Sequence, residues 1–134
     1  MKSDFKKKEV IIMLILDNQV SVLMMKKDND GRYLSKLNKQ ATSILTEAFG
    51  GATIESTSGT WLNGSKLYTD RSYKVTCNYA KKLTAKQLKA LLTVVRMEFL
   101  QGGQHAVSVV SNGTLYILER SDLNQLESIF VKKL

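Results

Sequence analysis

The sequence predicts an α+β fold, a ferredoxin-like split βαβ sandwich in which an antiparallel sheet carries two main helices on one face. Two observations lead to this prediction. From Gln19 onward, segments with two-residue alternation and segments with helical spacing follow in the order strand, helix, strand, strand, helix, strand. Two Asn-Gly pairs mark hairpins between strands. We expect an added N-terminal strand and an added C-terminal helix, and a layer sandwich of another α+β topology is the alternative.

Length and composition predict one domain over residues 1–134. The chain has 134 residues, 43% of them hydrophobic and 24% charged, with no proline. A domain of this size buries enough surface to be stable without disulfides, which fits the single cysteine. We expect residues 1–18 to form an N-terminal extension or extra strand, 19–118 the core, and 121–134 the C-terminal helix.

The first regular segments are apolar and rich in β-branched residues. Four lysines precede a segment that begins near Glu9 and contains the apolar run Val10–Leu16, which Asp17 and Asn18 separate from Gln19–Met25. We expect both stretches to be strands. The run is too short to cross a bilayer, and no small-residue cleavage site follows it, so we expect a cytoplasmic protein without a membrane segment.

Two segments have helical spacing. The first begins at Ser35, a candidate N-cap, and ends at Gly50-Gly51. The second begins at Thr84, with Gln87 completing a capping box, and stops at Gly102-Gly103. The apolar positions expected to face the core are Leu37, Ala41, Ile44, Leu45, Ala48 and Phe49 in the first, and Leu88, Leu91, Leu92, Val95 and Phe99 in the second.

The remaining strands lie between turn signals. Ala52–Thr57 reads as a strand, followed by a turn at Gly59 and a second turn at Asn63-Gly64. From Asp70 the chain alternates, which places Tyr73, Val75, Cys77 and Tyr79 toward the core and Ser72, Lys74, Thr76 and Asn78 on an open face. A final hairpin is predicted around Asn112-Gly113, and Ser121 is expected to cap the closing helix.

Positive charge is concentrated in one part of the chain. The formal net charge is +8, and residues 61–90 contribute +6 of it because Asp70 is their only acidic residue. If these residues form one surface, that surface favours phosphate-bearing partners, with salt-sensitive affinity. The alternative is a set of solubilising lysines on exposed faces.

Few residues are available for catalysis. The chain has one histidine, His105, and one cysteine, Cys77, which excludes most zinc and Cys/His schemes. No glycine pair has the spacing of a phosphate-binding loop. The loop Asp28–Gly31 resembles the start of a calcium loop, but Lys39 stands where the glutamate ligand is required. We therefore expect no metal, no cofactor and no catalytic residue.

Trp61 lies between two turn signals and directly before the basic segment. Its indole either stacks on a base or folds over an edge of the core. The ligand-binding residues predicted from the sequence are Trp61, Lys66, Arg71, Lys74, Lys81 and Lys82.

A pattern of short motifs spans roughly residues 20 to 80. Phe49-Gly50-Gly51-Ala52-Thr53 and Gly59-Thr60-Trp61 are followed by Gly64, Leu67, Tyr68 and Asp70. This pattern resembles small accessory proteins of phages and other mobile elements. The resemblance implies a phage or mobile-element origin and, for some such proteins, inhibition of host immunity.

These observations favour a non-enzymatic protein that binds an anionic partner, namely a nucleic acid, a guide ribonucleoprotein or a signalling nucleotide. In a phage setting such binding would antagonise host antiviral defence. The second hypothesis is a protein-interaction module, a homo-oligomer or an inhibitor of a host defence protein, acting through a sheet face or edge. The third is a nucleotide hydrolase that uses His105.

Overall fold

The computed structural model describes residues 13–133, which form one antiparallel sheet with helices on one of its faces. The strand order is β2-β3-β1-β4-β5. The elements are β1 (Asn18–Met25), α2 (Ser35–Phe49), β2 (Thr53–Asn63), β3 (Lys66–Tyr79), α3 (Ala85–Leu100), β4 (Ala106–Ser111), β5 (Thr114–Glu119), the 3-10 helix η1 (Arg120–Gln125) and α4 (Leu126–Lys133).

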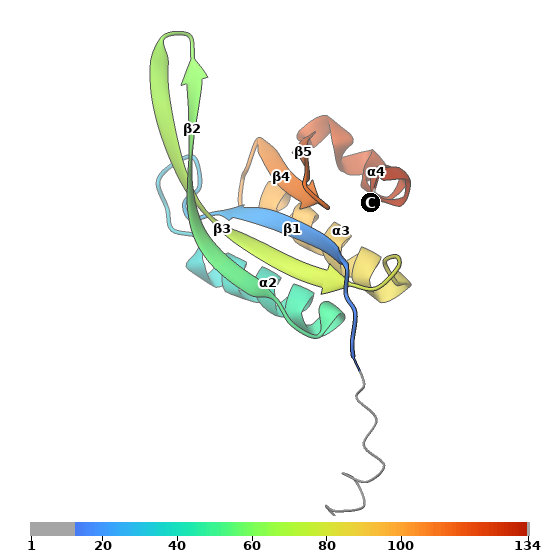
Figure 1. Cartoon of the computed structure of the whole chain (residues 1–134). Helices are drawn as coiled ribbons and strands as arrows, with labels where there is room; N and C mark the ends of the chain where they lie inside the picture. Colours follow the sequence, from blue (N-terminus) through green and yellow to red (C-terminus); the bar gives the residue numbers. More distant parts are fainter. Residues whose placement is uncertain (1–12, 134) are drawn as a thin grey trace, which may run out of the picture.

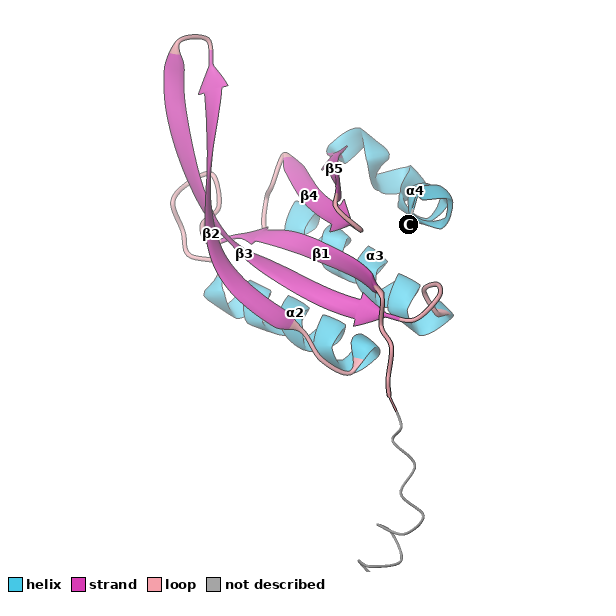
Figure 2. Cartoon of the chain, viewed as in Figure 1, coloured by secondary structure: helices cyan, strands magenta, loops and turns pink. Residues whose placement is uncertain are grey.

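The predicted fold class is confirmed. Strands β1 to β4 with helices α2 and α3 have the order and the antiparallel pairing of the split βαβ sandwich. Figure 1 shows α2 and α3 behind the sheet, and Figure 2 shows the opposite face without helical cover. The C-terminal helix α4 packs against α3 and contributes Leu126 and Phe130 to the core.

The core lies between the sheet and the helices. Alternate residues of the central strand, Val20, Val22 and Met24, are fully buried, as are Leu45 of α2 and Leu91 of α3. The side chains of β3 alternate between the two faces of the sheet as predicted, and Val75, Cys77 and Tyr79 are buried in this core. Lys74, Thr76 and Asn78 follow the opposite alternation and are partly exposed on the open face. Ser72, expected to be exposed on that face, is 5% exposed instead, because it pairs with Thr57 of β2 and the two hydroxyls form a hydrogen bond of 2.7 Å.

The helix ends agree with the sequence at two positions and differ at one. The capping box between Thr84 and Gln87 is present, and Gly50 takes the left-handed conformation at the end of α2. The predicted Ser35 cap is wrong, because the N-cap is Leu34 and no side chain caps this helix. Leu34 is buried and its amide donates to the carbonyl of Lys26, so tertiary contacts fix the start of α2 in place of a hydroxyl.

One long hairpin replaces the predicted pair of turns in the middle of the chain. Strand β2 continues through Gly59, which pairs with Asp70 of β3, so the predicted turn there is wrong. A hairpin turn is present beside the predicted Asn63-Gly64, but one residue later: Asn63 ends β2 and pairs with Lys66, and the turn residues are Gly64, with a positive φ, and Ser65. Eleven residue pairs join β2 and β3. The tip of this hairpin extends beyond the edge of the helical layer, as Figure 1 shows. Continuous cross-strand pairing outweighs the turn tendency of a single glycine.

The two ends of the chain differ from expectation in detail. Residues 13–17 form no strand, the rest of the expected N-terminal strand lies outside the described residues, and the fifth strand is β5 instead. Ser121 does not cap the closing helix. Glu119 starts the 3-10 helix η1, with its amide donating to Asp122, and α4 begins at Leu126. Within residues 13–133, no helix is long and apolar enough to cross a membrane.

We predict that Gly102→Ala destabilises the protein by about 1–3 kcal/mol, measured by urea denaturation. An added Cβ would lie 2.6 Å from the backbone oxygen of Glu98, and a backbone atom at the end of α3 cannot move aside cheaply. Gly51→Ala is the matched control, because nothing lies within 4 Å of its added Cβ. Equal stabilities of the two variants would contradict the prediction.

Candidate functional site

A cavity of about 560 Å³ lies where the β2–β3 hairpin meets the loop after β1 and the loop before β4. Its size lies in the range of pockets that bind small molecules. The lining residues are Met25, Lys26, Lys27, Asp28, Asn29, Tyr33, Trp61, Thr69, Asp70, Arg71 and Gln104. The pocket therefore combines aromatic rings, carboxylates and cations.

The hairpin wall contains a fixed indole. The Trp61 ring stacks on Tyr68, its partner across the hairpin, with 4.6 Å between ring centroids and 17° between planes. Its Nε1 donates to Oδ2 of Asp70 at 2.7 Å. Asp70 pairs with Gly59, two residues before Trp61 on β2, so the indole and the carboxylate belong to neighbouring residue pairs on one face of the hairpin. Trp61 remains 46% exposed, so a bound molecule can contact its ring.

The loop after β1 forms the opposite wall. Its Asp28 Oδ1 accepts from the amides of Asp30 and Arg32, which holds the turn. Lys27 and Tyr33 form a β-bridge, and Nζ of Lys27 lies 4.7 Å above the centre of the Tyr33 ring. These contacts place an aromatic ring, a carboxylate and an ammonium group beside each other at the pocket.

Gln104 joins the two loops of the pocket. It is 7% exposed, and its Nε2 donates to the carbonyl of Gly102 at 3.1 Å and, over a long 3.5 Å, to that of Lys27. A second link runs from Nδ2 of Asn29 to the carbonyl of Gly103 at 3.0 Å. The loop after α3 therefore supports the loop after β1.

The structure brings three of the six predicted binding residues together. Trp61 and Arg71 line the pocket, and Nζ of Lys66 lies 5.1 Å above the ring of Tyr68, on which Trp61 stacks. The role of each of these residues in binding stays a prediction.

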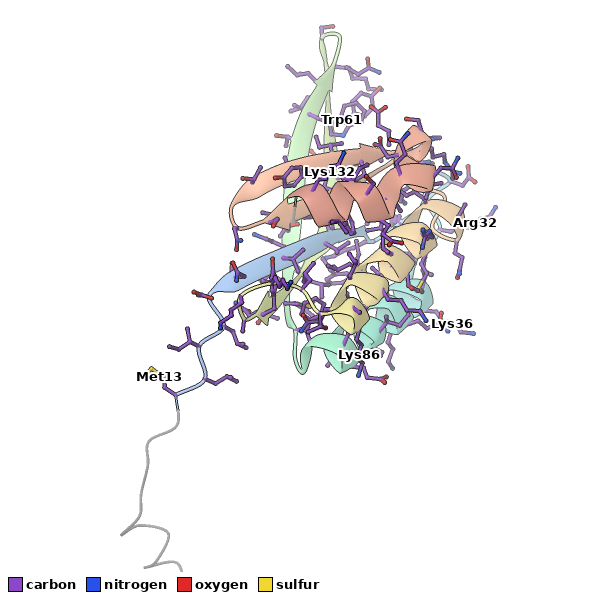
Figure 3. The ribbon with its side chains drawn as sticks, turned by 90° about the vertical axis from the view of Figure 1, so that its right-hand side faces the viewer. Met13, Arg32, Lys36, Trp61, Lys86 and Lys132 are labelled. Carbon is purple, nitrogen blue, oxygen red and sulfur yellow. The ribbon has the colours of Figure 1, made fainter. Side chains whose placement is uncertain are left out.

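The other three predicted binding residues lie elsewhere. Lys74 is half-buried on the open sheet face, and Lys81 and Lys82 follow the far end of β3. At about 3.3 Å per residue, β3 separates its two ends by roughly 43 Å. Figure 3 likewise shows Trp61 on the hairpin and Lys86 at the opposite end of the molecule. The basic segment is therefore not one continuous surface.

Sequence reasoning missed most of the pocket. No local motif marks the pocket residues Lys26, Lys27, Tyr33 and Gln104. Two signals were present. Asp70 is the single acidic residue of the basic segment, and the loop at Asp28 was considered only as a failed calcium site.

The two nucleophile or base candidates lie outside the pocket lining. His105 is exposed and follows Gln104. Cys77 is buried in the core, and desolvation raises the pKa of its thiol to about 11. Among the described residues, no group of three His, Cys, Asp or Glu side chains is arranged to hold a metal ion.

Known structures with the same fold come from a phage enzyme. A phage SAM lyase in complex with S-methyl-5'-thioadenosine matches with a TM-score of 0.59 and 13% identity, covering 83% of this chain and 98% of that chain. The apo state of a phage SAM lyase matches with a TM-score of 0.51 and 13% identity, covering 81% and 96%. No protein-family model and no curated protein matches the sequence. At this identity the match shows the shared fold.

The comparison corrects the expected function. A non-enzymatic protein that binds an anionic partner is contradicted, because both matched structures are of a lyase and therefore of an enzyme. The composition favoured a polyanion-binding surface. Both matched structures are instead of an enzyme, and one of them holds a small nucleoside derivative. The homo-oligomer and the host defence protein proposed as partners stay predictions.

We predict that Cys77 reacts at least 100-fold more slowly with iodoacetamide in the folded protein at pH 8 than in urea. With a pKa of about 11, about one thiol in a thousand is ionised at pH 8, and burial blocks access as well. The rate of alkylation is measured by mass spectrometry. Similar rates in the two states would contradict a structural role for this thiol.

Proposed function

We propose that the chain is a SAM-cleaving enzyme, a lyase that acts in the pocket between the hairpin and the loops at the ends of β1 and α3. The observation that carries this proposal is the pairing of Trp61 with Asp70 beside cationic side chains, on the fold of a phage SAM lyase that binds S-methyl-5'-thioadenosine. Neither the pocket nor the shared fold would carry the proposal alone, because one fold can host many activities and one pocket can bind many ligands.

The parts of S-adenosylmethionine match the groups of the pocket. Adenine offers an aromatic face that stacks on an exposed ring such as Trp61 or Tyr33. The positively charged sulfonium is attracted to the Asp70 carboxylate and to the faces of aromatic rings. The amino acid carboxylate of the substrate can pair with Arg71, Lys26 or Lys27.

The proposed reaction needs neither water nor a redox partner. The bond between sulfur and Cγ of the methionine part breaks, its electron pair returns to sulfur, and S-methyl-5'-thioadenosine leaves as a neutral thioether. Cγ then bonds to the substrate's own carboxylate oxygen to give a lactone, or the adjacent carbon loses a proton to give an alkene. In the lactone route the two products together contain all atoms of the substrate. In the alkene route one proton also leaves, and a pocket carboxylate such as Asp28 or Asp70 would accept it.

The pocket would promote this reaction mainly through orientation. Positive charge on sulfur disappears as the bond breaks, so the enzyme needs to hold the reacting atoms in line more than to stabilise a new cation. Asp70 is suited to this because Trp61 fixes one of its oxygens. Expulsion of water by the stacked adenine would strengthen the remaining charge interactions.

Cleavage of SAM also fits the resemblance to phage accessory proteins. An enzyme that consumes this cofactor would deprive host defence enzymes that depend on it. We infer that the protein acts in the cytoplasm of an infected host, where both the cofactor and those enzymes are found.

We predict that purified protein converts SAM to S-methyl-5'-thioadenosine, because the charged and aromatic groups of the pocket are complementary to those of this substrate. Products are separated by liquid chromatography and identified by mass spectrometry, which also distinguishes the lactone from the alkene. S-adenosylhomocysteine, which lacks the sulfonium charge, is the control substrate and should remain intact. Binding of neither SAM nor S-methyl-5'-thioadenosine in calorimetry, together with no turnover, would refute the proposed function.

We predict that Asp70→Asn lowers kcat/KM for SAM at least 100-fold, because the neutral amide no longer attracts the sulfonium and orients it for reaction. Glu47→Gln is the matched control: it also removes one negative charge, but on the exposed surface of α2, and should retain activity within twofold. Turnover is measured at fixed ionic strength. Equal losses in both variants would indicate a general charge effect and count against the pocket.

A further inference from the structure

Helix α3 contains a buried acid without a partner. Glu98 is 0% exposed, and neither oxygen of its carboxyl group has a hydrogen-bond partner. Buried glutamates in folded proteins are usually ion-paired or accept hydrogen bonds. An ionised Glu98 would therefore be strongly destabilising, and its environment calls for a proton.

The groups around Glu98 do not neutralise it. On η1, Nη2 of Arg120 donates to the carbonyl of Phe99. On the loop before β4, His105 is exposed, and after β1, Nζ of Lys26 lies above the ring of Tyr73. The charged side chains of α2 and α4 near this end are exposed, namely Lys36, Lys39, Glu127 and Lys132. Strand β4 has no titratable residue. Among the described side chains, no ion pair involves Glu98.

A second unpartnered acceptor lies at the same end of the helical layer. Asn38 on the first turns of α2 is 5% exposed; its Nδ2 donates to the carbonyl of Met25 at 2.8 Å, and its Oδ1 has no partner. Met97, which precedes Glu98, lies with Lys36 and Gln40 around one surface hollow between α2 and α3. The start of α2 therefore packs beside the end of α3. Both carboxyl oxygens of Glu98 and Oδ1 of Asn38 therefore lie at this end of the layer without a hydrogen-bond partner.

We propose that Glu98 is protonated in the folded protein and donates its proton to Oδ1 of Asn38, which makes Glu98 a positioning residue for the pocket. A proton supplies the one donor that this group of acceptors lacks. Desolvation raises the pKa of Glu98 to about 7, in agreement with a neutral carboxyl group below that pH.

This pair would support the pocket from two sides. Asn38 holds the carbonyl of Met25, a pocket residue, and Lys26 and Lys27 follow directly. The backbone oxygen of Glu98 accepts from the amide of Gln104 at 3.2 Å, and Gln104 also lines the pocket. Loss of the Glu98 proton would remove the donor, leave a buried charge and loosen both attachments.

The sign of the pH dependence follows from the direction of the shift. A carboxyl group whose pKa is higher in the folded than in the unfolded state stabilises the fold at low pH. As the pH rises, the unfolded chain loses this proton before the folded protein does, so the stabilisation is lost. The pKa rises from 4.5 to about 7, so this contribution declines between about pH 4.5 and pH 7 and is absent above that range.

The test uses the fluorescence of Trp61, the single tryptophan and a pocket residue, in the full chain without ligand. We expect the wild-type emission to change with an apparent pKa near 7. Glu98→Gln should abolish the change, because its amide donates at every pH, and should retain the low-pH emission. His105→Gln removes the single histidine, and Glu47→Gln removes an exposed acid of α2; both variants should keep the transition.

Thermal unfolding and infrared spectroscopy complete the experiment. Between pH 5 and pH 8 the Tm of the wild type should fall by about 5 °C or more beyond any fall in the Tm of Glu98→Gln. At pH 5 the wild type should show the stretch of a protonated carboxyl group that Glu98→Gln lacks. A transition that His105→Gln removes, or wild-type and Glu98→Gln proteins with equal pH profiles, would overturn the proposal. Neither readout requires SAM, so failure of the proposed enzymatic function leaves this test intact.

Discussion

The central position of β1 determines where the pocket forms. This strand pairs antiparallel with both β3 and β4, so its C-terminal end lies beside the middle of β3 and the start of β4. The loops on either side, 26–34 and 101–105, therefore meet at one end of the sheet, where the hairpin also projects. The buried face of β1, fully enclosed by α2 and α3, fixes this arrangement, because a shift by one residue would expose the core side chains.

Local patterns predicted most of the fold. Alternation in β3 and the capping box at Thr84 depend on neighbours in the sequence, so both could be read directly. The errors arose where tertiary contacts decide. Gly59 continues a strand because Asp70 and its neighbours pair opposite, and Ser35 is not needed as a cap because Leu34 is anchored by burial and by Lys26. A single sequence does not show either contact.

The pocket was beyond prediction for the same reason. Its groups come from three segments that are far apart in the chain, around Asp28, around Asp70 and at Gln104. Only the topology brings them together, and none carries a motif of its own. Trp61 was found because a tryptophan between turn signals is conspicuous, but its bond to Asp70 depends on the register of the hairpin.

Net charge alone also proved a poor guide to the ligand. A polyanion needs cations spread along a groove, whereas here the lysines of residues 61–90 are distributed over the hairpin, the open sheet face and the helical layer. The pocket instead places Asp28 and Asp70 among Lys26, Lys27 and Arg71. Such a mixture penalises a ligand with only negative charge, because the carboxylates repel it, and favours one with separate positive and negative groups joined to an aromatic ring. The few acidic residues are easily overlooked beside an excess of lysine, yet they give this pocket its mixed charge.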